Sequence, residues 1–269
     1  MRFLSLSKKI FSVSLAIFFL WAYSCKKSSS QALPPPHPAD TSAYKLVWSD
    51  AFNGTFVDTL AWNFETGGNG WGNNEQEYYQ AANATESNGY LVITAKKETV
   101  GSNGYTSARM TTQNKKEFTY GKIEARIALP VGQGLWPAFW LLGSDIGSVG
   151  WPACGETDIM EHINTDSLIY GTIHWDNNGH VQYGGNSPAS PSNFHIYTVT
   201  WDKTAIRWYL DSVEYKEANI QNNINSTEEF HKPFFIILNL AVGGNWPGQN
   251  IDDSKMPASM YVDYVRLYQ

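Results

Sequence analysis

The chain of 269 residues is long enough for one large domain or two small ones, and it combines 14% aromatic residues with only 16% charged residues. Its formal net charge is -6. The first 24 residues carry three basic side chains and no acidic one, so without them Lys+Arg falls from 19 to 16 and the charge becomes -9. An acidic chain is a poor candidate for binding nucleic acid or an anionic lipid surface. A neutral substrate therefore fits this chain better than a polyanion, and no nucleic-acid partner is expected.

The N-terminal 24 residues have the pattern of a signal peptide. Lys8-Lys9 precedes an apolar run from Ile10 to Ala22, which is shorter than the ~20 residues of a membrane-spanning helix. The adjoining Ala22-Tyr23-Ser24-Cys25 resembles a bacterial lipobox, in which the cysteine is lipidated and becomes the first mature residue. We therefore expect a protein anchored by lipid at Cys25 on a bacterial outer membrane or cell surface, with plain secretion as the alternative.

Residues 25–42 contain a serine run and Pro34-Pro35-Pro36 but no core-forming pattern, which predicts a flexible tether. If Cys25 carries lipid, Cys154 is the only remaining cysteine and no disulfide framework can form. Cys154 is then better interpreted as a small buried residue beside an acidic cluster than as a nucleophile.

From residue 43 to residue 269, short strand-like runs alternate with turn signals, and no convincing helical period occurs. One run, Phe234–Leu240, is almost continuously apolar and predicts a strand buried on both faces. Only Ser226–His231 is typical of a short helical turn. About a dozen strands in one domain predict an all-β, two-sheet antiparallel sandwich of jelly-roll type. The other clear runs are Lys45–Trp48, Tyr90–Thr94, Gly121–Ile127, Tyr197–Trp201, Ala205–Leu210 with Val213–Tyr215, and Met260–Tyr268.

Three carboxylates, Glu156, Asp158 and Glu161, occupy six residues of an otherwise apolar, strand-like segment. A solvated charged face is disfavoured by the apolar neighbours, and calcium would need more oxygen ligands and a suitable loop. Like charges held together shift their pKa values apart, which is how paired acids do acid–base chemistry. A catalytic carboxylate pair is therefore the leading interpretation.

In a flat strand Glu156 and Asp158 would share one face and Glu161 would point to the other. A β-bulge that adds one residue at Ile159-Met160 would bring all three acids to the same face. The Cα atoms of the two glutamates would then be roughly 13 Å apart, and their carboxyl groups could approach to about 5–6 Å. Separations near about 5–5.5 Å are typical of retaining glycosidases, and wider ones of inverting enzymes.

The segment Gly155–His162 resembles the E-x-D-x-x-E signature of glycoside hydrolase family 16, in the bulged form of laminarinase-type β-glucanases. The likeness extends from about Tyr44 to Gln269. The supporting segments are Leu46–Asp50, Trp71–Glu75 with Tyr78-Tyr79, Tyr105–Arg109, Gly134–Leu142, Gly243–Gly248 and Tyr261–Tyr268.

This resemblance implies a curved, concanavalin A-like jelly roll with an open cleft that cuts inside long polysaccharide chains. Carried over by position, Glu156 is the nucleophile, Glu161 is the general acid/base and Asp158 assists them. The reaction is then a double displacement that retains anomeric configuration and needs no cofactor.

The resemblance also implies substrate-binding positions. Trp136 and Trp140 share a face if their segment is extended, so both can stack on sugar rings. His162 follows Glu161 on the opposite face and is expected to be structural, while Glu75 is expected to fix its own loop. The full set of expected substrate-binding residues is Asn74, Arg109, Trp136, Trp140, His174 and Trp246.

Many members of this family bind a structural Ca2+ on the convex side, and the matching positions here are Ala51, Gly89 and Asp263. Family members often have Glu where this chain has Ala51, although a backbone carbonyl supplies that ligand. The sequence leaves both outcomes open, a bound calcium ion and none.

We expect a monomeric endo-acting β-1,3-glucanase or mixed-linkage β-glucanase. One alternative is a related hydrolase of agar, porphyran or carrageenan, and another is a non-catalytic β-glucan-binding protein on the same fold. The negative charge disfavours sulfated galactans, and the presence of all three acids disfavours a protein that only binds.

Overall fold

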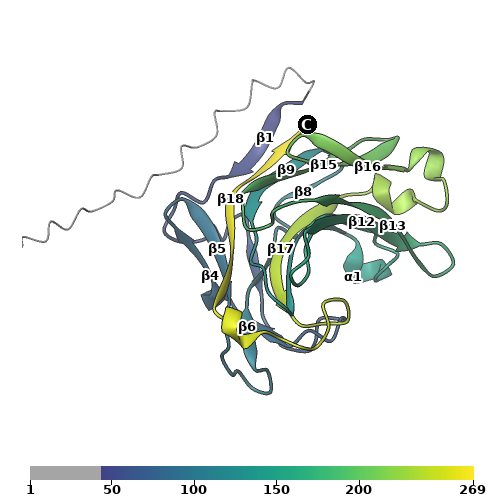
Figure 1. The fold of residues 1–269 in the computed structure, drawn as a ribbon. Coiled ribbons are helices and arrows are strands. Elements are labelled where there is room, and N and C mark those ends of the chain that lie inside the picture. Colours follow the sequence, from purple (N-terminus) through teal and green to yellow (C-terminus); the bar gives the residue numbers. More distant parts are fainter. Residues whose placement is uncertain (1–43) are drawn as a thin grey trace, which may run out of the picture. The chain divides into compact units, whose positions relative to one another are not determined.

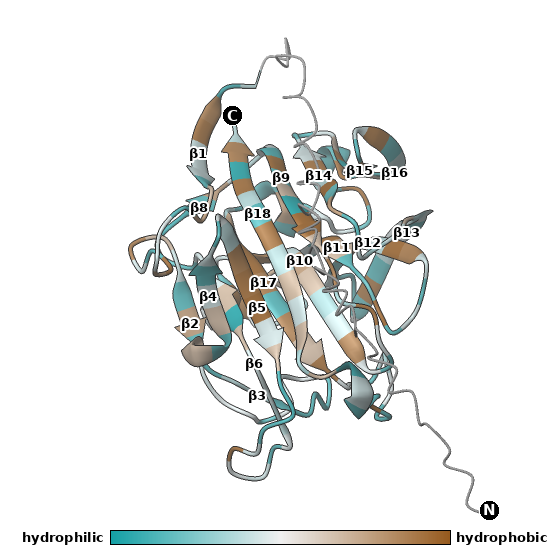
Figure 2. Ribbon diagram, turned by 60° about the vertical axis from the view of Figure 1, so that its left-hand side comes forward, coloured by the Kyte–Doolittle hydropathy of each residue, from teal (hydrophilic) through white to brown (hydrophobic). Residues whose placement is uncertain are grey.

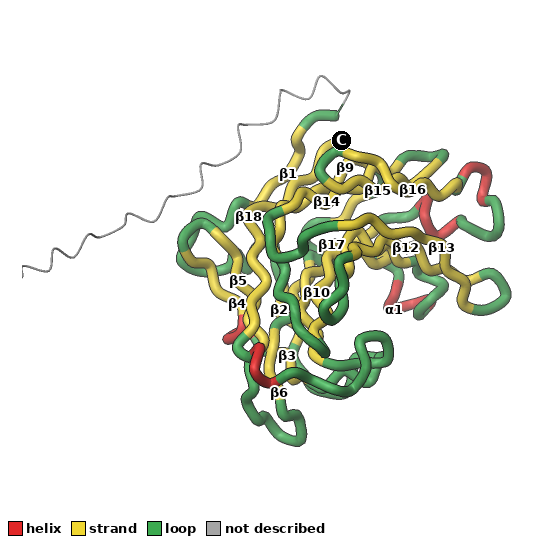
Figure 3. The backbone as a smooth tube through the Cα atoms, viewed as in Figure 1, coloured by secondary structure: helices red, strands yellow, loops and turns green. Residues whose placement is uncertain are grey.

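The computed structural model describes residues 44–269, which form two antiparallel β-sheets (Figure 1). The expected signal peptide (1–24), the tether (25–42) and the lipidation site Cys25 lie outside the described residues and stay predictions. The all-β sandwich is confirmed. Within residues 44–269, helices are limited to short segments between strands (Figure 3), and none is long and apolar enough to cross a membrane.

The first sheet has eight strands. Its order is β16 (Val213–Asn219), β15 (Ala205–Leu210), β14 (His195–Trp201), β9 (Gly121–Ala128), β18 (Ala258–Tyr268), β5 (Tyr90–Ala95) and β4 (Ala84–Ser87), and β1 (Leu46–Asp50) also pairs with β18. Segments distant in sequence thus become neighbours: the C-terminal strand β18 lies between β9 and β5.

The second sheet also has eight strands and carries the site. Its order is β13 (His180–Pro188), β12 (Leu168–Asp176), β11 (Glu156–Glu161), β10 (Leu135–Gly143), β17 (Phe234–Val242), β7 (Arg109–Thr111) and β2 (Asn63–Glu65), with β8 (Glu117–Phe118) also paired to β17. A parallel pair is formed by β3 (Glu77–Tyr79) and β6 (Tyr105–Ser107). The helix α1 (Ile146–Val149) lies on the concave side of β12 and β13 (Figure 1). Four 3-10 turns span Ala81–Asn83, Gln221–Asn223, Glu228–His231 and Asp253–Lys255.

The long predicted strands and the predicted turn all form. The hairpin between β15 and β16 turns at Asp211 and Ser212, whose φ values of 49° and 72° suit a tight two-residue connection. The helical turn expected near residue 226 is the 3-10 turn Glu228–His231. Strands of two or three residues such as β8 and β2 were not predicted, because they are too short to show an alternating pattern.

The apolar core consists of buried residues from both sheets, and Figure 2 shows hydrophobic residues on strands of each sheet, such as β5 and β17. Every residue of β17 is buried, because one face of this central strand meets the core and the other forms the floor of the cleft. By contrast, the pattern of β18 alternates, since one of its faces is closer to solvent. Cys154 is fully buried, as expected.

Candidate active site

Strand β11 contains the predicted bulge. Asp158 pairs with Thr172 and Glu161 with Tyr170, so three steps along β11 match two along β12. Ile159 and Met160 are the extra pair, and both lie in the core between the sheets. Two consecutive core-facing residues shift the alternation by one. As a result Glu156, Asp158 and Glu161 all line one cleft.

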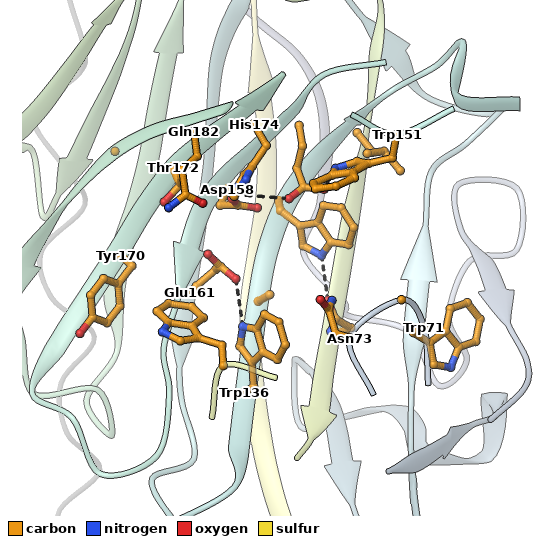
Figure 4. Close-up of a pocket in the computed structure, with 18 of the residues that line it drawn as sticks. Trp71, Asn73, Trp136, Trp151, Asp158, Glu161, Tyr170, Thr172, His174 and Gln182 are labelled. Atoms are coloured by element: carbon orange, nitrogen blue, oxygen red, sulfur yellow. Dashed lines mark hydrogen bonds and ion pairs between the residues drawn. The ribbon is translucent and has the colours of Figure 1, made fainter. Parts of the chain in front are cut away.

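The cleft has a volume of about 1000 Å3 and lies across the concave face of the second sheet. Alternate residues of β10 and β12 line it, while the residues between them are buried, and residues 182–186 of β13 line it consecutively. Loops bring Trp71, Trp151 and Trp246 to it. Figure 4 shows Glu161 and Trp136 directed toward one another, with Asp158 beside His174.

At one end of the acidic cluster, Glu156 and Asp158 share an aromatic and imidazole environment. Trp151 Nε1 donates to Glu156 Oε2 over 3.1 Å. His174 Nε2 lies 3.2 Å from Asp158 Oδ2 and 3.8 Å from Glu156 Oε1. Asp158 is 3% exposed, so its charge has little access to water. His174 therefore lies where it can stabilise negative charge on either carboxylate.

Glu161 has fewer partners. Its Oε1 accepts a hydrogen bond of 2.9 Å from Trp136 Nε1, and the residue is 8% exposed. Trp136 is in turn packed edge-on against Trp246 at 5.7 Å between ring centroids. Gly244, with φ +133°, leaves space for the Trp136 ring, since a Cβ there would lie 3.2 Å from it.

Burial raises the pKa values of all three acids, and repulsion from Asp158 adds to the shift of Glu156 and Glu161. Burial, then the Asp158 charge, raises the pKa of Glu156 to about 8, against lowering effects from His174, the Trp151 N–H and Arg109. Burial raises the pKa of Asp158 to about 8. Burial, then Asp158, raises the pKa of Glu161 well above its ordinary value. Glu156 has more groups that stabilise its anion than Glu161 has, which favours the ionised form of Glu156 relative to that of Glu161.

The bulge is held from the opposite sheet. Trp208 of β15 is fully buried, and its Nε1 donates to the main-chain oxygen of Asp158 over 2.7 Å. Gly171 of β12 lies opposite the bulge, where a Cβ would come within 2.4 Å of Trp208 Cδ1 and 2.5 Å of the Tyr215 hydroxyl. Only a residue without a side chain permits this approach.

Most of the predicted substrate-binding residues do line the cleft. Trp136, Trp140, His174, Arg109 and Trp246 all contribute to its wall. Trp140 Nε1 donates to Asn239 Oδ1 over 2.8 Å, which orients the indole. The guanidinium of Arg109 lies over the rings of Trp71 and Trp140, at 5.2 and 4.8 Å, and pairs with Glu65.

Asn74 is the exception among these residues. It does not line the cleft: its Nδ2 donates to Asn245 Oδ1 over 2.8 Å, and its backbone has φ 56°. The neighbouring Asn73 lines the cleft instead. A left-handed residue turns the loop so that the adjacent side chain faces inward, which no residue-level pattern revealed. Glu75 accepts from the Tyr79 hydroxyl at 3.0 Å and so fixes this loop, as expected.

Two further residues that contact the predicted Glu156 and His174 were not predicted from the sequence. Trp151 reaches Glu156 from the loop before β11, and His180 of β13 stacks on His174 with ring centroids 5.1 Å apart. His174 Nδ1 and His180 Nε2 are 2.8 Å apart. The sequence carried a signal for His180, since Asn177-Asn178-Gly179 is a turn that pairs the flanking strands. His162 is buried and contacts the Asp166 carbonyl, so its expected structural role fits its position.

The positions of the expected calcium site lie on neighbouring segments of the first sheet. Asp50 pairs with Val265 and Leu91 with Val262, which places Ala51 and Gly89 beside Asp263. The only carboxylate among the three accepts from Arg126 Nη1 over 2.6 Å. Calcium takes six to eight oxygen ligands. In this arrangement the residues therefore do not fit a calcium ion, because the guanidinium already neutralises Asp263.

The bulged triad in a cleft on a two-sheet sandwich defines a glycoside hydrolase domain. The chain belongs to glycosyl hydrolases family 16, whose model matches residues 72–266. A beta-glucanase of Rhodothermus marinus is 40% identical over 84% of this chain and 85% of its own length. The alpha subunit of clotting factor G of Tachypleus tridentatus is 45% identical over 84% of this chain, which spans only 34% of that relative. The laminarinase catalytic domain of Thermotoga maritima is 43% identical with a TM-score of 0.78, covering 84% of this chain and 98% of that one. The family predicted from the sequence is confirmed.

Proposed function

We propose that the protein is an endo-acting, retaining β-glucanase that cleaves β-1,3-linked or mixed β-1,3/1,4-linked glucans. The observation that carries this proposal is the bulge in β11, which brings Glu156, Asp158 and Glu161 to one wall of an open cleft lined with indoles. The similarity to a beta-glucanase and to a laminarinase catalytic domain supports this substrate class.

In the proposed reaction Glu156 attacks the anomeric carbon while Glu161 donates its proton to the leaving glycosidic oxygen. The C–O bond to the leaving sugar breaks, and a covalent glycosyl-enzyme forms at Glu156. Glu161, now ionised, removes a proton from water, and the hydroxide displaces Glu156 to give the retained product. When Asp158 is ionised, its charge raises the pKa of Glu161, which favours the protonated form of Glu161 in the first step.

The charges along the cleft favour a neutral substrate. Among the described residues that line the cleft, Arg109 is the sole Lys or Arg, and its guanidinium is already paired with Glu65. A sulfated galactan would bring anionic groups into a cleft that carries at least four carboxylates, those of Glu75, Glu156, Asp158 and Glu161. Neutral glucan, whose ring faces stack on indoles, avoids this repulsion.

The test is a side-by-side digestion of laminarin, barley β-glucan and agarose by the full chain, with E156Q as the inactive control. The proposal predicts reducing-sugar release from laminarin, with or without barley glucan, and a mixture of oligosaccharides early in the digest. Release from agarose alone would establish the galactan alternative. Binding of laminarin by wild type without any shortening would establish the glucan-binding alternative.

We also propose that the protein is a monomer anchored by lipid at Cys25 outside the cytoplasm. The support is the basic and apolar pattern before Ala22-Tyr23-Ser24-Cys25. Mass spectrometry of the natively expressed chain checks the anchor: a diacylglyceryl adduct on Cys25 is expected, and a soluble chain cleaved elsewhere would contradict it. Light scattering checks the monomer. Calcium has no part in the proposed reaction, and the melting temperature in calcium against EDTA is expected to be unchanged.

A further inference from the structure

Glu156, Asp158 and His174 bring three potential metal-ligand atoms together, all within 4.8 Å of one another. The imidazole Nε2 of His174 is 3.2 Å from Asp158 Oδ2 and 3.8 Å from Glu156 Oε1. A tetrahedral ion with bonds of about 2.0–2.2 Å holds its ligand atoms about 3.3–3.6 Å apart. The cluster therefore has nearly the spacing of such a site without rearrangement of the backbone.

Asp158 provides a second, independent observation. Its side chain is 3% exposed, and its Oδ2 has no hydrogen-bond partner among the described residues. His174 Nε2 is close enough to be that partner, yet the contact does not have hydrogen-bond geometry. The Asp158 oxygen and the His174 nitrogen therefore lie close together in the cleft without a hydrogen bond between them. A buried oxygen in this position is costly unless something binds it.

His174 is also held in a fixed orientation. Its Nδ1 is 2.8 Å from His180 Nε2, and the two rings are stacked with 16° between their planes. Trp151 covers His180 at 4.6 Å between ring centroids. Histidines that bind metal usually have their second nitrogen engaged in this way, which fixes the ring and directs the free nitrogen at the ion.

We propose that Glu156, Asp158 and His174 form a binding site for a divalent transition-metal ion of the zinc type, which reversibly blocks the nucleophile. One imidazole and two carboxylates form a donor set that suits zinc. Calcium and magnesium prefer more oxygen ligands and no nitrogen. Binding rests on the cluster alone, whereas inhibition also rests on the proposed role of Glu156 as nucleophile.

Calorimetric titration of the full chain with zinc chloride measures the site directly. Wild type is expected to bind one ion here, with a dissociation constant below about 100 µM. H174Q removes a ligand and H180F removes the group that orients it while keeping an aromatic ring, so each is expected to weaken binding about tenfold or more. H195Q is the matched control, because His195 pairs with Asp211 at another place on the first sheet and should leave binding unchanged.

Competition with substrate keeps the proposal testable if a variant folds poorly. In E161Q, which retains all three ligands, a saturating laminarin oligosaccharide is expected to displace zinc. In wild type, zinc is expected to raise the apparent KM for laminarin reversibly with EDTA, while magnesium at the same concentration has no effect. Absence of binding to wild type, or equal binding to wild type and H174Q, overturns the proposal. A wild type that binds zinc but does not hydrolyse glucan would contradict the proposed function and leave the metal site standing.

Discussion

Carboxylates lie on the outer faces of both sheets, but their partners differ. On the first sheet, Asp263 pairs with Arg126 at 2.6 Å. Glu124 of the same sheet lies 3.3 Å from Lys122 and 3.7 Å from Arg266. Both of these acids have a basic partner, so their charges are neutralised locally. The Asp263–Arg126 and Glu124–Arg266 pairs join β9 and β18, and their role is structural.

In the cleft, none of Glu156, Asp158 and Glu161 forms an ion pair with Lys or Arg within residues 44–269. Indole N–H groups and one imidazole are their partners, and burial raises all three pKa values. Such a cluster destabilises the fold, since buried like charges repel. The comparison teaches that three neighbouring acids without basic partners on one cleft wall, and not acids in general, identify the catalytic wall.

Removal of a cleft acid should have the largest effect on activity. E161Q is expected to lower kcat on laminarin by about 10²- to 10⁴-fold, because the leaving oxygen loses its proton donor. E156Q should leave no covalent intermediate and lower kcat at least as much. E214Q is the matched control, since Glu214 is an exposed acid on β16 and should leave kcat unchanged. Comparable activity in E161Q and wild type would rule out its role as the acid.

Loss of the hydrogen bond that holds the bulge in β11 should have the second-largest effect on activity. W208F keeps a buried ring but removes the N–H that binds the Asp158 carbonyl, so kcat is expected to fall roughly 10- to 100-fold as the acids shift. W201F is a matched control, because Trp201 Nε1 donates over 2.8 Å to the Phe230 carbonyl, which does not line the cleft. Each variant should lose about 1–3 kcal/mol of unfolding free energy. If W208F and W201F lower kcat equally, the hydrogen bond from Trp208 to the bulge has no specific role in catalysis.

Removal of the Glu161 charge should raise the stability of the folded protein, whereas it lowers activity. The folded-state pKa of Glu161 is raised, so the folded protein binds this proton more tightly than the unfolded chain does. Wild type therefore loses stability as pH rises from about 4.5 through the raised pKa, whereas a glutamine does not. E161Q should melt a few degrees higher than wild type at pH 8, roughly 2–4 °C per kcal/mol, with no difference at pH 4. A difference that is independent of pH would contradict this reasoning.

The paired acids of the first sheet should show the smallest effects. D263N leaves Arg126 without its partly exposed partner and is expected to cost about 0.5–1 kcal/mol of unfolding free energy. Its kcat and KM on laminarin should stay within twofold of wild type. A large loss of activity in D263N would mean that the two sheets are coupled more closely than their different partners indicate. Thermal melts and laminarin kinetics on the same sample give both answers.

Much of the fold and of the catalytic wall could be predicted from the sequence, because both depend on local residue patterns. The alternation around Glu156 and the five-residue offset to Glu161 predicted the bulge, and the continuous apolar run predicted β17. The partners of the acids could not be predicted. Trp208 lies 50 residues away from Asp158 along the chain, and only the packing of the two sheets brings its N–H to the bulge.

Loop conformation accounts for the remaining differences between the predicted and the observed cleft residues. Asn73 and Asn74 are adjacent and chemically identical, and only the left-handed backbone at Asn74 decides which one faces the cleft. Trp151 and His180 come from loops and strand ends whose registers depend on turn geometry. Side-chain periodicity carries no information on these choices, because it describes regular strands alone.

Azide rescue tests the central claim, that Glu156 and Glu161 act as nucleophile and acid/base from one face of a bulged strand. With an activated aryl β-glucoside oligomer and azide, E156A should give the α-glycosyl azide, because the anion replaces the missing nucleophile directly. E161A should give the β-glycosyl azide, because azide attacks the glycosyl-enzyme still formed at Glu156. Proton NMR of the anomeric signal distinguishes the two products. Opposite anomers in this order are predicted; the reverse order, or the same anomer from both variants, would contradict the account.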